Sequence, residues 1–245
     1  MKRAFWILIL IAIGMGCASA NPACIDGNTL QQYLTAYNGL ANACQIGDKL
    51  FFNFTYTSSA GGGATPVAAS SIHVAGVVSD PLDPGIQFQV GQYFTSALQS
   101  KDGTIGYSVV TTDSGDVIED ADLTIDSSIT RGTGSVSGTE HLYFPGTSTD
   151  INAGSPIVDV YPSSSFTHIN FIDFGGPFLN GIDVLTAIHV AADANSFATI
   201  SAVEEHFSEE IVPEPYGVLL VGSGMLFVFA RKWRERTALS RSNGN

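Results

Sequence analysis

Apolar and polar residues alternate along much of the chain between residues 50 and 203, and this period of two permits few folds. The clearest example is the run from Ile86 to Val90, which reads Ile-Gln-Phe-Gln-Val. The other β-rich segments are residues 50–56, 72–76, 105–109, 121–125, 135–144, 166–174, 182–190 and 198–203. Clusters of Gly, Pro, Ser and Asp between them are typical of turns. The sequence therefore predicts a mainly β fold, an antiparallel β-sandwich of jelly-roll-like kind.

One segment near the N-terminus departs from this pattern. Residues 29–40 carry Leu30, Leu34 and Tyr37 at helical spacing. This spacing predicts one short N-terminal helix beside the sandwich.

The first twenty residues have the composition of a secretory signal peptide. A basic Met-Lys-Arg start precedes an apolar run, and small residues at Ala18 and Ala20 mark a cleavage site. The apolar run is shorter than the ~20 residues that a membrane span requires. We therefore expect residues 1–20 to be removed after Ala20.

A second apolar run, residues 216–230, carries no charge and is followed by a group of cations. As a helix it would rise ~22 Å, against a hydrocarbon core of ~30 Å, so the predicted transmembrane helix is short. The cations that follow are Arg231, Lys232, Arg234 and Arg236. A buried core helix would not need them, whereas a membrane stop signal would, because such charges hold the C-terminal tail in the cytoplasm.

The C-terminal region resembles a PEP-CTERM sorting signal. The resemblance lies in Pro213-Glu214-Pro215, the Gly-rich apolar run after it, and the Arg-rich cluster near the chain end. It implies a signal peptide (1–20), a secreted domain (21–212), a sorting signal (213–236) and a cytoplasmic tail (237–245). It also implies recognition by exosortase, a membrane-embedded enzyme, in a Gram-negative bacterium; many bacteria with such signals make extracellular polysaccharide, which is a candidate partner. The chain would cross the cytoplasmic membrane, be anchored by one helix, and reach the envelope or the extracellular space after processing.

The predicted secreted domain is strongly acidic. Residues 21–212 contain 21 acidic residues and only Lys49, Lys101 and Arg131 as fixed cations, a formal charge of −18. Such a field repels nucleic acid, anionic lipid and acidic polysaccharide, and this argues against all three as direct ligands. The length fits a single domain with a sizeable core.

After removal of the signal peptide two cysteines remain, Cys24 and Cys44. In an oxidising envelope an even pair predicts a disulfide, which would stabilise the fold by ~3 kcal/mol on the loop-entropy model. Neither the spacing nor the neighbouring residues suit a redox or metal centre.

No catalytic motif stands out in the sequence. The five histidines have no partner histidine at short helical or strand spacing, and no nucleophile elbow, phosphate-binding loop or zinc motif is present. The acidic run contains four candidate calcium ligands, Asp113, Asp116, Glu119 and Asp120, although the EF-hand spacing is missing. A solvated acidic turn is the alternative interpretation, and we expect no other cofactor.

Two functions therefore remain open. The first is a noncatalytic envelope component that acts in matrix, adhesion or carbohydrate association. The second is a secreted hydrolase that acts on polysaccharide through a site without a sequence motif. Exposed aromatic residues would favour binding, and the candidates are Tyr93, Phe94, Tyr143, Phe144 and Phe178.

The stop-signal interpretation predicts the effect of removing the cations. Replacing Arg231, Lys232, Arg234 and Arg236 with Gln should let the C-terminal tail pass through the membrane, because uncharged flanks no longer resist translocation. Protease accessibility of a tag placed after Asn245 measures this orientation. An unchanged orientation in the variant would contradict the prediction.

Overall fold

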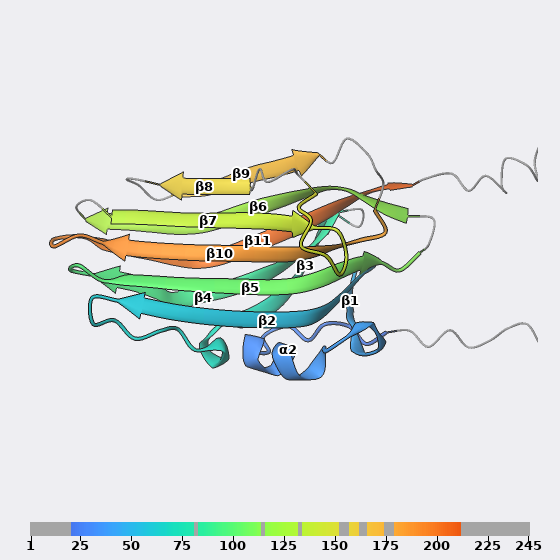
Figure 1. Ribbon diagram of the computed structural model, residues 1–245, viewed down its shortest axis with the longest axis horizontal. Helices are drawn as coiled ribbons and strands as arrows, with labels where there is room; N and C mark the ends of the chain where they lie inside the picture. The colour runs from blue at the N-terminus through green and yellow to red at the C-terminus, as the bar shows by residue number, and fades with distance from the viewer. Residues whose placement is uncertain are drawn as a thin grey trace, which may run out of the picture.

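The computed structural model describes residues 21–80, 83–113, 116–131, 134–151, 157–161, 166–173 and 179–211. They form two antiparallel sheets packed face to face (Figure 1). Sheet A has the order β1-β2-β5-β10-β7-β8, and sheet B has the order β3-β4-β11-β6-β9. The predicted β-sandwich is confirmed.

The strands of sheet A are β1 (Cys44–Ile46), β2 (Lys49–Gly61), β5 (Ser100–Thr111), β7 (Gly134–Tyr143), β8 (Ile157–Tyr161) and β10 (Gly181–Ala192). The strands of sheet B are β3 (His73–Asp80), β4 (Asp83–Ser96), β6 (Asp116–Arg131), β9 (Phe166–Asp173) and β11 (Phe197–Ile211). Strands β1 and β8 were not expected from the sequence, and β11 continues well beyond the predicted segment 198–203.

The strand pairing is that of a jelly roll. Four antiparallel pairs are nested along the chain, with β7–β8 innermost, then β6–β9, β5–β10 and β4–β11. Successive strands of this set mostly cross from one sheet to the other, which winds the chain around the core. Strands β1 and β2 extend sheet A beyond β5, and β3 extends sheet B beyond β4.

The inward faces of the two sheets form one hydrophobic core. Strands β4, β5 and β10 contribute alternate residues to it, as their sequences predict. A group of aromatic rings fills one part of this core, with centroids 5.6–6.3 Å apart: Phe51, Phe54, Phe88, Tyr107 and Phe207. Burial of this apolar surface is the main favourable contribution to folding.

The predicted alternation of Leu50, Phe52, Phe54 and Tyr56 on one face is wrong, because β2 contains a β-bulge. The register against β5 shifts between Phe52 and Thr55, and Asn53 adopts a positive φ of 58°. The extra residue places Phe51 in the main core, whereas Leu50 and Phe52 pack with Ala43 in a separate small cluster. A bulge reverses which face each side chain takes, so simple alternation failed at this point.

The N-terminal segment contains the predicted helix and disulfide. Helix α2 (Leu30–Ala36) lies beside β2 and is shorter than the expected segment 29–40. The chain leaves the helical conformation after Ala36, and Gly39, with a positive φ of 94°, precedes a separate 3₁₀ turn, η1 (Leu40–Asn42). Thr29 and Gln32 form a capping box at the helix start. A disulfide joins Cys24 to Cys44, twenty residues apart, and closes the loop around the helix. That pairing is confirmed.

Among the residues that the structure describes, no helix is long and apolar enough to cross a membrane. The expected span, residues 216–230, and the expected signal peptide, residues 1–20, lie outside the described part of the chain.

The last strand is fixed near its end by a buried ion pair. Lys49 Nζ lies 2.8 Å from Glu209 Oε1 and 3.2 Å from Asp48, and the Lys49 side chain is fully buried. Burial, with a hydrogen bond from protonated Glu209 to Asp48, raises the pKa of Glu209 to about 7, although Lys49 opposes this. The start of the described chain and the end of β11 lie at this same end of the sandwich (Figure 1).

Gly103 offers a direct test of the sheet packing. An added Cβ would stand 1.7 Å from the Tyr93 hydroxyl, which reaches across the core and lies 2.7 Å from the Tyr56 hydroxyl. We expect Gly103→Ala to lower the free energy of unfolding by about 1–3 kcal/mol, because Tyr93 must move in a packed core. Chemical denaturation measures the change.

Gly91→Ala is the matched control, since a Cβ at this strand position meets nothing within 4 Å. We expect a change of less than about 0.5 kcal/mol there. Equal losses in the two variants would show that contact with Tyr93 is not the cause.

Candidate functional site

The outward face of sheet A is lined by small hydroxyl side chains. Along β2, β5, β10 and β7 alternate residues are buried in the core, and the residues between them face solvent. Ser and Thr residues occupy many of these outward positions, among them Thr55, Thr57, Ser59, Thr104, Ser135, Ser137 and Thr139. Side chains this small leave a flat surface rich in hydrogen-bond donors and acceptors.

The register of the strands arranges these residues in rows. Ser59 on β2 is paired with Asp102 on β5, which is paired with His189 on β10, and His189 is paired with Ser137 on β7. The next row contains Thr57, Thr104, Ala187 and Thr139. With strands ~4.8 Å apart, each row crosses about 14 Å of the sheet. We call these two rows the hydroxyl face.

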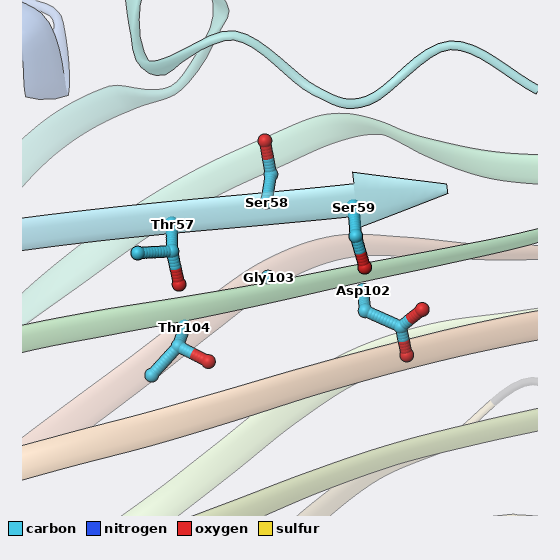
Figure 2. A pocket seen from close by; sticks show the side chains of 6 residues that line it. All are labelled: Thr57, Ser58, Ser59, Asp102, Gly103 and Thr104. Atoms are coloured by element: carbon cyan, nitrogen blue, oxygen red, sulfur yellow. The ribbon is translucent and has the colours of Figure 1, made fainter. Parts of the chain in front are cut away.

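A shallow depression of about 170 Å³ lies on the hydroxyl face between β2 and β5. Its lining consists of Thr57, Ser58, Ser59, Asp102, Gly103 and Thr104. Figure 2 shows Thr57 and Ser59 directed from β2 towards β5, beside Asp102 and Thr104, while Ser58 points the opposite way. Ser58 instead donates to the Val67 carbonyl at 2.8 Å. The depression is therefore open and polar, suited to hydroxylated or hydrated ligands.

Asp102 and His189 form a side-chain hydrogen bond on the hydroxyl face. Asp102 Oδ1 lies 2.6 Å from His189 Nδ1, with the Asp102 and His189 side chains 48% and 41% exposed. An exposed pair of this kind adds little stability. The hydrogen bond with Asp102 does orient the imidazole. When Nδ1 carries the ring proton and donates it to Asp102, Nε2 is left as an acceptor. The pair thus offers a bound ligand both a carboxylate and an oriented ring nitrogen.

Asp102, His189 and Ser137 are also the residue types of a serine hydrolase, on three adjacent strands. Such a site needs the serine hydroxyl on the free ring nitrogen, and paired N–H donors for the oxyanion. In the described part of the chain, no hydrogen bond joins Ser137 to His189. The backbone groups of these strands are engaged in the antiparallel ladders. The described part of the row thus lacks the serine–imidazole hydrogen bond that acyl transfer uses.

A second polar group lies on the opposite side of the sandwich, on the outward face of sheet B. His206 Nε2 is 2.7 Å from Glu204 Oε1, and His206 Nδ1 is 3.1 Å from the Asp83 carbonyl oxygen. Gln87 donates to the other Glu204 oxygen at 2.6 Å, and Asp122 is the cross-strand partner of His206. Burial works to lower the pKa of His206, but the Glu204 and Asp83 contacts and the nearby carboxylates raise it overall. Burial likewise raises the pKa of Asp122 to about 6.

The candidate calcium ligands lie at the start of β6 and in the turn before it. Asp113 and Glu119 are exposed, and Asp116 and Asp120 are partly buried. Glu119 occupies a bulge, since the register with β11 shifts between Ser208 and Glu209. Within the described ranges, no three His, Cys, Asp or Glu residues are arranged to hold a metal ion.

The sorting residues Pro213, Glu214 and Pro215 and the cations Arg231, Lys232, Arg234 and Arg236 lie outside the described residues. Each remains a prediction from the sequence.

The five aromatic candidates for binding differ in their exposure. Tyr93 is fully buried and belongs to the core. Tyr143 is partly exposed and stacks on His141, with ring centroids 6.1 Å apart, and Phe144 follows it at the end of β7. Nothing is described of the Phe94 and Phe178 side chains. Because the two rows of the hydroxyl face contain no Phe, Tyr or Trp, a ligand bound to them would be held mainly by hydrogen bonds.

Sequence reasoning did not single out Asp102 and His189. The two residues are 87 positions apart, and only the pairing of β5 with β10 brings them together. The sequence does contain one indication of their position, because both residues fall at strand positions that alternate with buried apolar residues and therefore face solvent.

No profile of a known protein family matches the chain, and no curated protein matches its sequence. Among solved structures, the enzymatically active domain of bacteriophage CBA120 tailspike protein 4 aligns at 8% identity and a TM-score of 0.31, over 62% of this chain and 19% of that one. The module TmCBM61, in complex with β-1,4-galactotriose, aligns at 8% identity and a TM-score of 0.29, over 61% and 86%. A family 11 carbohydrate-binding module from Clostridium thermocellum aligns at 14% identity and a TM-score of 0.24, over 61% and 86%. With TM-scores this low, function has to be inferred from the residues of this chain.

The His206 group leads to a prediction about protonation. Glu204→Gln should lower the pKa of His206, because it removes the negative charge that stabilises the imidazolium. In the wild type, the raised pKa contributes stability that is present below about 6.5 and is lost as the pH rises through the folded value. NMR titration of the imidazole signals measures the shift.

Asp102→Asn provides the control, because Asp102 lies on the opposite sheet and its replacement should leave the His206 titration unchanged. An unaltered His206 titration in Glu204→Gln would exclude Glu204 as the cause.

Proposed function

We propose that the sandwich is a noncatalytic binding domain that holds uncharged polysaccharide on the hydroxyl face and acts at the surface of the cell. The observation that carries this proposal is the row of Ser59, Asp102, His189 and Ser137 beside an open polar depression. Extended, flat and polar, this face suits a chain that presents hydroxyl groups along its length.

The charges of the domain favour a neutral ligand. Twenty-one acidic residues against three fixed cations in residues 21–212 create a field that repels acidic polysaccharide. Asp102 places a carboxylate at the depression itself, where it can accept hydrogen bonds from sugar hydroxyls. A neutral glycan is therefore the ligand class that this face tolerates.

The affinity for a short ligand should be modest. Each hydrogen bond exchanged with water contributes about 0.5–1.5 kcal/mol, and the rows on the hydroxyl face contain no Phe, Tyr or Trp on which a sugar could stack. A long polysaccharide can engage several copies of the domain at once, which raises the effective affinity without new contacts. This suits a component of an extracellular matrix.

The delivery route is part of the proposal. The tail with Pro213, Glu214 and Pro215 resembles the signal recognised by exosortase, and the chain would be exported, anchored and then processed. The Cys24–Cys44 disulfide supports an oxidising compartment. Strand β11 ends at Ile211, so the expected membrane helix would begin five residues later, at most about 17 Å away. Before processing, the domain would thus stand close to the membrane.

Affinity electrophoresis of the purified protein in gels with a neutral glucan, galactan or mannan tests the binding. We expect retardation in at least one neutral gel and none in alginate, which is acidic. Asp102→Ala and His189→Ala should each weaken binding about tenfold, the equivalent of ~1.4 kcal/mol.

Gln89→Ala is the matched control, because Gln89 is an exposed polar residue on the outward face of sheet B. It should bind like the wild type. Absence of retardation in every neutral gel, or equal binding by all variants, would refute the assignment to the hydroxyl face.

A further inference from the structure

Two glutamates point into the core from facing sheets. Glu140 lies on β7 in sheet A and Glu205 on β11 in sheet B, and both are completely buried. Glutamate is rarely buried without a charged partner, because removing a carboxylate from water costs several kcal/mol. Their presence in the core requires a physical explanation.

The two carboxyl groups differ in their hydrogen bonds. Glu205 accepts from the hydroxyls of Tyr107 on β5 and Thr186 on β10, so both of its oxygens are engaged. Glu140 is paired in register with Thr186, yet neither of its side-chain oxygens has a hydrogen-bond partner in the structure. Glu205 can therefore carry negative charge at lower cost than Glu140.

Within the described part of the chain, no cation contributes to the electrostatics of these two acids. The groups that face or influence the pair are Tyr107 on β5, Thr186 on β10 and Asp122 on β6. The cross-strand neighbours of Glu205 on β4 and β6, Ile86 and Leu123, are apolar. Lys49, the buried lysine of the described chain, is already paired with Asp48 and Glu209.

Burial and mutual repulsion act on the pair in the same direction. Burial raises the pKa of Glu140 well above its ordinary value, and the charges of Glu205 and Asp122 raise it further. Burial also raises the pKa of Glu205 to about 7, although the hydrogen bonds from Thr186 and Tyr107 oppose this. Two acids that interact in this way lose their protons in coupled steps.

We propose that Glu140 and Glu205 form a proton-dependent lock between the two sheets, in which a protonated Glu140 keeps the core closed and its ionisation loosens the packing of sheet A on sheet B. The lock is independent of any ligand on the hydroxyl face. With this lock, the free energy of unfolding of the domain would be highest at acidic pH and would fall progressively as the pH rises.

The sign follows from proton counting. Below a pH of about 4.5 the glutamates are protonated in both the folded and the unfolded chain, so they add no pH dependence. Above it the unfolded chain releases these protons while the folded chain retains them. Stability therefore falls as the pH rises towards the folded pKa values, by up to about tenfold in the folding equilibrium constant per pH unit for each retained proton.

Urea unfolding of the full-length protein between pH 5 and pH 9, followed by circular dichroism, tests the lock. We expect the wild type to lose stability with rising pH and Glu140→Gln to lose distinctly less per pH unit, because the amide cannot ionise. The pKa values of His206, Asp122 and Glu209 are raised as well, so these groups add their own pH dependence. The difference between wild type and variant is therefore the diagnostic quantity.

Glu119→Gln is the control, because it removes one exposed carboxyl from a strand. Its free energy of unfolding should change with pH by the same amount per unit as that of the wild type. Identical slopes for the wild type and Glu140→Gln would overturn the lock. If Glu140→Gln does not fold, carboxyl ¹³C NMR of the wild type labelled at glutamate replaces it. Glu209 has a raised pKa as well, so its signal is first assigned with Glu209→Gln. At least one other glutamate signal should remain protonated at pH 7, and ordinary titration of every glutamate except Glu209 would overturn the proposal equally.

Discussion

The register of β10 between β5 and β7 connects the hydrophobic core to the polar surface of sheet A. Because side chains alternate along a strand, Ile188 and Val190 enter the core while His189 faces outward. A slip of one residue would bury the imidazole and expose its apolar neighbours. The same register places His189 against Asp102, so the core and the candidate binding surface are specified by one set of strand pairings.

Much of the architecture could be predicted from the sequence, because most strands are buried on one face only. Segments such as Ile86 to Val90 then show a clean alternation, and the strands inferred from it all exist. The disulfide was predictable for a different reason, since only Cys24 and Cys44 remain after the expected signal peptide. The sequence indicates a jelly roll only through its fold class, and the nested strand pairs agree with that winding.

Other features depend on contacts that a local pattern does not contain. The bulge at Asn53 reverses the facing of β2 within an otherwise regular strand, and the short strand β8 (Ile157–Tyr161) has too few residues to show a period. Asp102 and His189 meet only through the pairing of distant strands. Glu140 could have been noticed, because it occupies the inward phase of β7 between Gly138 and Leu142. Its acidic character conflicts with that position, and such conflicts often mark a functional or conformational role.

The place of β11 in sheet B has a mechanical consequence. This strand of fifteen residues is the last described element, and it pairs with β4 on one side and with β6 on the other. A load applied to the chain beyond Ile211 would run along the strand axis and shear both ladders at once, instead of peeling an edge strand bond by bond. The buried contact of Glu209 with Lys49 lies near the point where such a load enters. A domain attached to a surface through this strand would resist extraction by drag more firmly than one attached through an edge.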